Sequence, residues 1–185
     1  MLNDLYEDAH DRMKKTIENL ENDYKRVRTG RASISLVDGI RVDYYGTSTP
    51  LNQLATLTVP EPRSIMIQPW DSSIINEVEK AILKSELGLT PMNDGKSIRI
   101  NVPPLTAERR KELVKVIKKM AEESKVATRN IRRDVIEMIK DLKKEKEISE
   151  DEQFKAQDEI QKITDDYIKK VDTVYSAKEK EILEL

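Results

Sequence analysis

The distribution of glycine and proline along the chain constrains its fold more than any other feature of the sequence. All five glycines and all seven prolines of the 185 residues lie between residues 30 and 105. Proline removes a backbone donor and glycine lowers helix stability, so both residue types interrupt long helices. The stretches before and after this segment can therefore form long, continuous helices, whereas the segment itself must adopt another structure.

Apolar and tyrosine side chains recur every three or four residues in the flanking stretches, which is the spacing of one helix face. The pattern predicts a first helix of about 27 residues that ends at Thr29-Gly30, a second of about 40 residues that starts near Thr106, and a third in the C-terminal part. The predicted core positions are Tyr6, Ala9, Met13, Ile17, Leu20, Tyr24 and Val27; Leu113, Ile117, Met120, Ala127, Ile131, Val135, Met138 and Leu142; and Ile160, Ile163, Tyr167, Val171, Val174, Ile182 and Leu185.

A chain reversal is expected between the second and third helices. The apolar pattern breaks at Ser149, and Glu152 follows three residues later, which is the spacing of a capping box. Acidic side chains occupy the first turn after Ser149, where the helix dipole favours them. Three long amphipathic helices, with an apolar repeat of about 3.5 residues, predict a three-helix bundle.

The middle segment alternates apolar and polar side chains, which is typical of strands. The alternating stretches are residues 40–44, 57–59, 65–67 and 98–102. Asp71 or Ser72 can cap a helix that ends at Leu87-Gly88, and Asn93-Asp94-Gly95 is a turn signal ahead of the last strand. The predicted fold class is therefore α+β, with a small β/α/β domain inserted into the helical bundle.

The nesting of one domain in the other predicts two chain crossings that act as a hinge. The predicted boundaries are residues 1–29 plus 106–185 for the discontinuous bundle, residues 30–105 for the inserted domain, and residues 29–31 and 102–105 for the hinges. Gly30 permits torsional change in the first crossing, whereas Pro103 and Pro104 fix φ in the second. We expect restricted swinging of the small domain, with Arg110 as a further hinge residue.

Composition argues against an enzyme and against a membrane protein. The chain has no cysteine and one histidine, His10, so it lacks the residues for thiolate metal sites or a nucleophile relay. The glycine patterns that cradle phosphate are missing, and no apolar run approaches the ~20 residues that cross a bilayer. We expect no catalytic residue, no metal, no cofactor and a cytoplasmic location.

Charge is unevenly distributed along the chain. The formal net charge is only -2, yet residues 106–146 carry a net +6 and residues 147–185 a net -6. A basic helix is thus followed by an acidic one. If the two helices are neighbours, their attraction stabilises the pair and the outer face of the basic helix remains available for an anionic partner.

Three arginines in the middle of the second helix stand out. Arg129, Arg132 and Arg133 lie three and four residues apart and share one face, and Arg129 is expected nearly opposite the core position Ala127. Lysines extend this stripe in both directions: Lys118, Lys125, Lys140 and Lys143. Guanidinium groups are forked and permanently charged, which suits phosphate oxygens. The alternative is a solvated face held by helix salt bridges such as Arg133 with Glu137.

The chemistry of this stripe favours structured RNA over single strands. Aromatic residues, on which unpaired bases stack, do not interleave with the basic residues. Arg28 and Arg31 flank Gly30, and Arg109 and Arg110 follow Pro104, so further cations lie near the predicted hinge. These arginines can either contact RNA or hold the two domains together.

Several short motifs, in order and spacing, resemble those of the bacterial ribosome recycling factors, and the resemblance covers essentially the whole chain. The motifs are Arg28-Thr29-Gly30-Arg31-Ala32-Ser33, Asp38-Gly39, Tyr44-Tyr45-Gly46-Thr47, Glu79-Lys80-Ala81-Ile82, Leu87-Gly88-Leu89, Pro103-Pro104-Leu105-Thr106, Glu108-Arg109-Arg110-Lys111, Arg129-Asn130-Ile131-Arg132-Arg133-Asp134 and Lys146-Glu147-Ile148-Ser149-Glu150-Asp151. Each motif alone is weak, and only their combination is specific.

The resemblance implies an L-shaped, monomeric protein that acts after translation termination. Members of that family bind ribosomal RNA of the large subunit and, with elongation factor G and GTP, split the ribosome and release messenger and transfer RNA. Carried over by motif, Arg129 and Arg132 are the chief RNA contacts, Arg133 is a neighbour, and Arg28 and Arg31 are contacts or hinge supports. Lys125 belongs to the same basic stripe.

Two functions of other classes stay open at this level. A helical adaptor that binds a protein partner predicts that the arginine stripe is dispensable. A hydrolase with a carboxylate pair predicts turnover without a ribosome.

Overall fold

The computed structural model describes residues 1–184, which fall into two compact units. One unit comprises residues 1–29 and 107–184, and the other comprises residues 30–106. Each unit has its own buried apolar cluster. The architecture is α+β, as predicted from the sequence.

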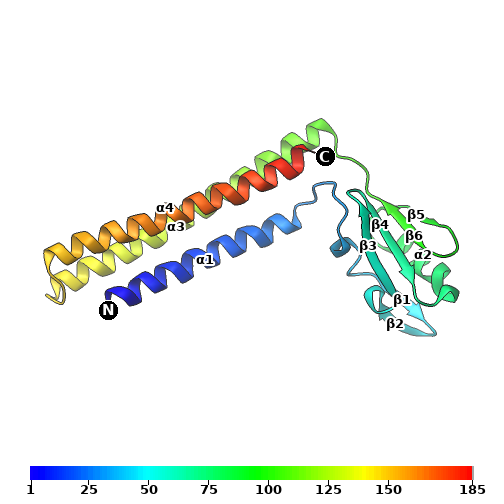
Figure 1. Cartoon of the computed structure of the whole chain (residues 1–185), viewed down its shortest axis with the longest axis horizontal. Helices are drawn as coiled ribbons and strands as arrows, with labels where there is room; N and C mark the ends of the chain where they lie inside the picture. Colours follow the sequence, from blue (N-terminus) through cyan, green and yellow to red (C-terminus); the bar gives the residue numbers. More distant parts are fainter. Residues whose placement is uncertain (185) are drawn as a thin grey trace. The chain divides into compact units, whose positions relative to one another are not determined.

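Three long helices form the first unit: α1 (Leu2–Arg26), α3 (Ala107–Lys144) and α4 (Glu150–Leu183). Each helix contacts the other two. Helices α3 and α4 run side by side along their lengths (Figure 1). Helix α1 is antiparallel to α3, since the Arg12 guanidinium contacts Asp134 while the Tyr24 hydroxyl donates to the carbonyl of Ile117.

The reversal between α3 and α4 has the predicted capping box. The Ser149 hydroxyl accepts a hydrogen bond from the backbone N–H of Glu152, and the Glu152 carboxylate accepts one from the backbone N–H of Ser149. Two backbone donors at the start of α4 are thereby satisfied. This local geometry fixes where the acidic helix begins.

The buried face of α3 differs from the predicted one over part of its length. Ala121, Thr128 and Ile139 are buried, whereas Ala127 is half-buried and Met138 is exposed. The Thr128 hydroxyl donates to the carbonyl of Ser124 within the helix, so Thr128 buries without an unpaired polar atom. Thr128, whose hydroxyl is hydrogen-bonded within the helix, thus occupies the core position that the apolar pattern assigned to Ala127.

The ends of the helices also differ slightly from prediction. Helix α1 ends at Arg26, with Val27 in an extended conformation, rather than at Thr29-Gly30. Gly30 does have a positive φ of 80°, but it lies beyond the helix. The predicted core residue Leu185 lies outside the described residues.

The second unit contains two sheets and one α-helix. Its elements are η1 (Ile34–Leu36), β1 (Arg41–Tyr44), β2 (Thr47–Pro50), η2 (Leu51–Gln53), β3 (Ala55–Glu61), β4 (Ser64–Pro69), η3 (Ser72–Ile74), α2 (Ile75–Lys84), β5 (Pro91–Asn93) and β6 (Ile98–Asn101). Strands β1 and β2 form a hairpin, and the other four form an antiparallel sheet in the order β3-β4-β6-β5. Strands β2 and β5 are additions to the predicted set.

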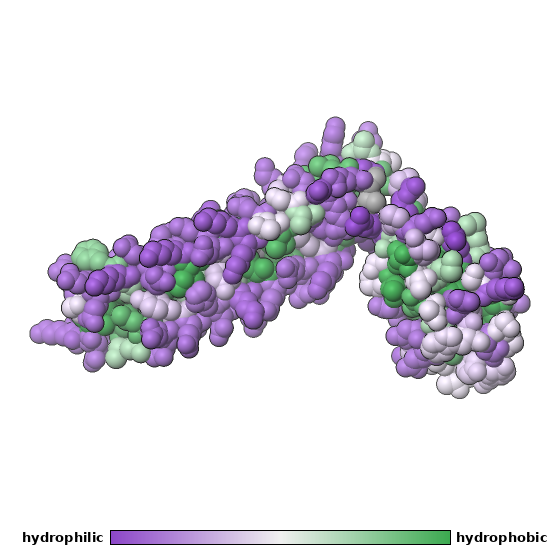
Figure 2. Space-filling model, in the orientation of Figure 1, coloured by the Kyte–Doolittle hydropathy of each residue, from purple (hydrophilic) through white to green (hydrophobic). Residues whose placement is uncertain are grey.

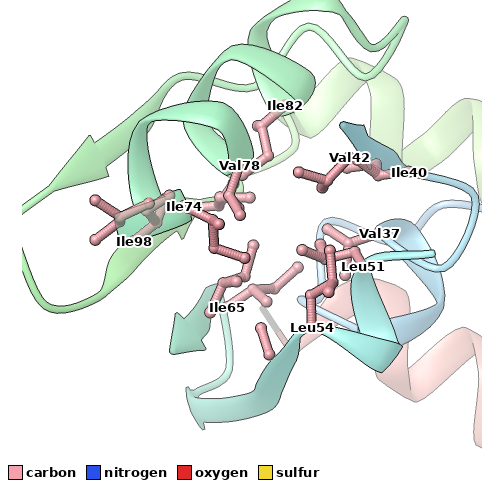
Figure 3. Packing of buried hydrophobic residues seen from close by; sticks show 14 residues of the cluster. Val37, Ile40, Val42, Leu51, Leu54, Ile65, Ile74, Val78, Ile82 and Ile98 are labelled. Atoms are coloured by element: carbon pink, nitrogen blue, oxygen red, sulfur yellow. The ribbon is translucent and has the colours of Figure 1, made fainter. Parts of the chain in front are cut away.

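The core of the second unit lies where α2 meets the strands. Val78 and Ile82 of α2 and Val42 of β1 point into one apolar cluster with Ile65 of β4 and Ile98 of β6 (Figure 3). All five are fully or almost fully buried. The strands and the helix are therefore held as one body by shared side-chain burial.

The surface of the helical unit is mostly hydrophilic, with small separate apolar areas in the face shown in Figure 2. Among residues 1–184, no helix combines the length and the apolarity needed to span a membrane.

Candidate nucleic-acid interface

Helix α3 carries the predicted arginine cluster on the flank of its buried stripe. Because one residue turns the helix by about 100°, Arg129 lies one step from the buried Thr128 and is itself half-buried. The prediction that Arg129 lies opposite the core is therefore wrong. Arg132 is also half-buried, whereas Arg133 is exposed. We call Arg129, Arg132 and Arg133 the arginine row; Arg132 contacts α4, and Arg133 is the exposed member.

Arg132 is held by a side chain of α4. Its Nη1 donates to Oε1 of Gln161 at 2.9 Å, and Nε2 of Gln161 donates to Oδ1 of Asp165 at 2.8 Å. Arg132 contacts no carboxylate directly in the described part of the chain. Its positive charge is thus oriented by a neutral group and is not cancelled by an adjacent anion.

Arg129 and Arg133 have no hydrogen bond or ion pair to any residue in 1–184. The helix salt bridge between Arg133 and Glu137, which was the alternative interpretation of this stripe, does not form. Lys118 and Lys140 are exposed and likewise unpaired within that range. The stripe therefore presents several cations whose donors are available to an anionic ligand.

Lys125 differs from the arginines. Its Nζ lies 2.6 Å from Asp172 of α4 and 3.4 Å from Glu122, and only 16% of its side chain is exposed. The hydrogen bond to Asp172 raises the pKa of Lys125 above its ordinary value of 10.5, with Glu122 adding to the effect. Lys125 is therefore paired with a carboxylate, which α4 supplies.

The remaining predicted cations lie near the ends of the helices. Arg28 and Arg31 are exposed and have no partner among residues 1–184. Arg110 is half-buried, and its Nη1 donates to the carbonyl of Leu183 at 3.1 Å, which ties the start of α3 to the end of α4. Arg109 pairs with Glu112 on its own helix.

The two predicted hinge segments meet at Gly30. A Cβ at this position would lie 3.2 Å from Cγ of Leu105, which is tighter than ordinary packing, and φ is positive. A left-handed conformation and a close neighbour both favour glycine here. Pro103 and Pro104 are exposed.

The described residues offer little for catalysis or metal binding. His10 Nδ1 lies 3.4 Å from the Tyr167 hydroxyl, and the two rings meet edge to face. This contact joins α1 to α4. No cluster of three or more His, Asp and Glu side chains in residues 1–184 is arranged to hold a metal ion.

Sequence reasoning did not identify the side chains of α4 that organise the stripe, namely Gln161, Asp165 and Asp172. They lie on one flank of α4, since intervals of four and seven residues return to nearly the same direction. The sequence alone predicts that these three residues share a flank. It does not predict which residues of α3 this flank contacts, because the rotation of each helix about its axis depends on which apolar residues are buried.

Known proteins are similar to this chain over nearly its whole length. A family model described as ribosome recycling factor matches residues 20–183. The ribosome-recycling factor of Syntrophobacter fumaroxidans is 78% identical over 185 residues, and that of Desulfatibacillum aliphaticivorans is 61% identical over 184 residues, with 100% of both chains covered in each case.

Two solved structures are similar over nearly the full length. A solution structure of the ribosome recycling factor has a TM-score of 0.73 and 45% identity, covering 100% of this chain and 98% of the other. A second structure contains the T. thermophilus ribosome recycling factor and E. coli elongation factor G bound to the E. coli post-termination complex. It has a TM-score of 0.62 and 48% identity, with 99% of each chain covered. The chain belongs to the ribosome recycling factor family, whose members are translation factors and not enzymes.

Proposed function

We propose that this protein recycles ribosomes in the cytoplasm after translation termination, by binding large-subunit ribosomal RNA and, with elongation factor G and GTP, splitting the ribosome into subunits. Family membership supports the process, and the similar factor bound with elongation factor G to a post-termination complex supports the partners. The protein acts as a monomer that supplies binding surfaces and movement, while the translocase supplies the energy of GTP.

One observation supports α3 as the RNA-binding element. Arg129, Arg132 and Arg133 follow one another along one flank, and none of them forms an ion pair with a carboxylate in residues 1–184. RNA phosphates are anionic, and guanidinium groups bind them with forked, charge-assisted hydrogen bonds. An A-form RNA helix is recognised mainly through its backbone and shape, which a rigid helix with a row of cations suits.

The remaining cations contribute unequally to this proposal. Arg28 and Arg31 have free donors and can contact RNA near the end of α1. Lys125 must first leave Asp172, so its contribution to RNA affinity is expected to be the smallest of the set. Arg110 supports the end of the bundle through the carbonyl of Leu183.

Splitting requires that the factor bind the separated ribosome better than the intact one, since equal affinity for both states shifts no equilibrium. The two chain crossings provide the movement in this proposal. Gly30 in its left-handed conformation and the pair Pro103-Pro104 restrict the directions in which the inserted domain swings. Elongation factor G would act on the inserted domain while the arginine row holds RNA.

The substitution Arg132→Ala tests the binding face. We expect a loss of large-subunit binding and of subunit splitting, each by about tenfold, because one charge-assisted contact is removed from a desolvated interface. Arg41→Ala is the matched control, since Arg41 is exposed on β1 and its side chain has no hydrogen bond or ion pair in residues 1–184. Unchanged splitting by the Arg132 variant, with the helix content intact, would contradict the assignment.

A test of the proposed hinge requires a substitution that changes its flexibility without disturbing the local fold. Proline at position 30 cannot adopt the positive φ of Gly30, so that change disturbs the local fold along with any swinging. Pro103→Gly combined with Pro104→Gly loosens the second crossing without that conflict. We expect splitting to fall while large-subunit binding is retained; equal losses in both measurements would argue against a mechanical role.

A further inference from the structure

The contact between Arg132 and α4 assigns a role to two residues that neither the motifs nor the comparisons single out. We propose that Asp165 and Gln161 form a relay that positions the Arg132 guanidinium for RNA while leaving its charge unneutralised. The proposal rests on the function proposed above. Gln161 and Asp165 are positioning residues in it, and Arg132 is the group that touches RNA.

The orientation of the Gln161 amide is determined by both of its partners. A guanidinium only donates hydrogen bonds, so Arg132 must face Oε1 of Gln161, at 2.9 Å. An ionised carboxylate only accepts them, so Asp165 must face Nε2, at 2.8 Å. A flipped amide would set donor against donor at Arg132 and acceptor against acceptor at Asp165. Asp165 thus keeps the Gln161 oxygen turned toward the arginine.

The neutral amide has a specific electrostatic consequence. Helix α4 lies in the acidic part of the chain, where residues 147–185 carry a net -6, and elsewhere on the same flank it contacts α3 with a carboxylate. Asp172 approaches Lys125 to 2.6 Å and forms an ion pair. At Arg132 the acidic residue, Asp165, contacts the Gln161 amide and not the arginine. Arg132 is thereby oriented by α4 but keeps donors and charge for a phosphate.

The same flank of α4 therefore contacts Lys125 with a carboxylate and Arg132 with a neutral amide. A carboxylate directly against the cation competes with RNA phosphate for it, because RNA must displace the carboxylate and leave it unpaired. An amide restricts the side chain without that competition. The relay predicts that charge at position 161 matters more for RNA binding than the hydrogen bond itself.

Four substitutions separate these effects. Gln161→Glu places a carboxylate against Arg132, whereas Gln161→Met keeps the size of the side chain and removes its hydrogen bonds. Asp165→Ala releases the amide so that it can flip, and Asp165→Asn keeps an acceptor for Nε2 of Gln161. Lys155→Gln is the charge control for Gln161→Glu, since it also lowers the net charge by one. Lys155 lies on an exposed part of α4, has no hydrogen bond in residues 1–184 and interacts electrostatically with Glu152.

The experiment measures binding of the full-length variants to purified large ribosomal subunits over a series of salt concentrations. We expect Gln161→Glu to weaken binding by about tenfold, because Arg132 becomes paired within the protein. The salt slope should become shallower by the amount that corresponds to about one lost phosphate contact. Gln161→Met and Asp165→Ala should weaken binding by about two- to threefold with the salt slope unchanged, because the charge remains but is less well placed. Asp165→Asn and Lys155→Gln should stay close to the unmodified protein.

A double-mutant cycle excludes a merely structural effect. In an Arg132→Ala background, Gln161→Glu should have no further effect on binding, because the group through which it acts is gone. Melting temperatures should be unchanged throughout, since exposed polar pairs contribute little to stability.

The possible results distinguish the relay from the function on which it rests. If Gln161→Glu binds as well as Lys155→Gln while Arg132→Ala binds poorly, the relay is wrong and the arginine face stands. The relay is also wrong if the Gln161 variants weaken binding equally with and without Arg132. If Arg132→Ala itself binds normally, the proposed RNA face is wrong.

Discussion

The helical unit and the inserted unit use their side chains in opposite ways. In the helical unit the buried stripe is narrow and the long helices expose rows of charge, so its surface carries the chemistry. The inserted unit buries Val, Ile and Leu from short strands and α2 around one centre. Surface substitutions should therefore change what the helical unit binds, whereas core substitutions should decide whether the inserted unit keeps its fold.

The largest expected effect comes from opening a cavity in each unit separately. Ile67 of β4 and Ile160 of α4 are fully buried in the two clusters. Ile67→Ala and Ile160→Ala should each lower the free energy of unfolding by about 2–5 kcal/mol. Two probes separate the units. Fluorescence of Trp70, the single tryptophan, reports on the inserted unit, where its Nε1 donates to the Thr56 hydroxyl. Far-UV circular dichroism reports mainly on the helices.

We expect Ile67→Ala to lower the temperature of the fluorescence transition more than that of the helical transition, and Ile160→Ala to do the reverse. Ser48→Ala serves as the control in the inserted unit, since Ser48 is exposed on β2 and its side chain has no hydrogen bond in residues 1–184. If both transitions move together in both variants, the two units unfold as one, and the comparison between them fails.

The next effect in size tests the first crossing between the units. Gly30→Ala should lower the free energy of unfolding by about 1–3 kcal/mol, because φ is positive and the new Cβ meets Leu105 Cγ at 3.2 Å. Gly39→Ala is the matched control, as no atom lies within 4 Å of its Cβ position. Thermal unfolding measures both variants. Equal melting temperatures for the two alanine variants would show that position 30 is not constrained.

A smaller effect concerns the helix cap that starts the acidic helix. Ser149→Ala removes the hydroxyl that accepts from the Glu152 backbone and should lower stability by about 1 kcal/mol. Ser176→Ala on the same helix is the control, because Ser176 is exposed and has no hydrogen bond within residues 1–184. Denaturant unfolding with unchanged m-values measures the difference, and a larger loss for Ser176→Ala would contradict the capping role.

The smallest effect is a pH dependence at the same cap. The backbone N–H and hydroxyl of Ser149 donate to the Glu152 carboxylate and lower the pKa of Glu152 below its ordinary value of 4.5. A carboxyl group with a lowered pKa in the folded state stabilises the protein above its unfolded pKa, and this stabilisation is lost as pH falls through the folded pKa. The stability advantage over Glu152→Gln should therefore shrink below about pH 4.5. An advantage that is constant from neutral to acidic pH would contradict this contribution.

The comparison of units also explains what the sequence could predict. The three helices, the Ser149–Glu152 capping box and the Asn93-Asp94-Gly95 turn follow from local patterns, and the structure confirms them. Strand β2 is Thr-Ser-Thr-Pro, without an apolar alternation, and β5 has three residues. Each pairs with a single neighbouring strand, so pairing and not periodicity defines it.

The sequence predicted which arginines form the candidate site but not which residues of α4 they contact. The arginine spacing and the resemblance identified the residues, and the basic and acidic segments suggested a neighbouring helix pair. The exact rotation of α3 was missed, since a buried Thr128 does not look apolar. For the same reason the sequence could not show that Lys125 meets Asp172 whereas Arg132 meets Gln161.

The arginine row of α3 is the face that we propose binds RNA. Its most direct test is the salt dependence of large-subunit binding for the triple variant Arg129→Ala, Arg132→Ala, Arg133→Ala. We expect a salt slope shallower by about 2–3, since each lost phosphate contact removes about 0.7–0.9. The control removes three exposed cations elsewhere, Lys14, Lys15 and Lys155, and should keep the slope of the unmodified protein. Equal slopes for the triple arginine variant and the unmodified protein would show that the arginine row does not bind RNA phosphates.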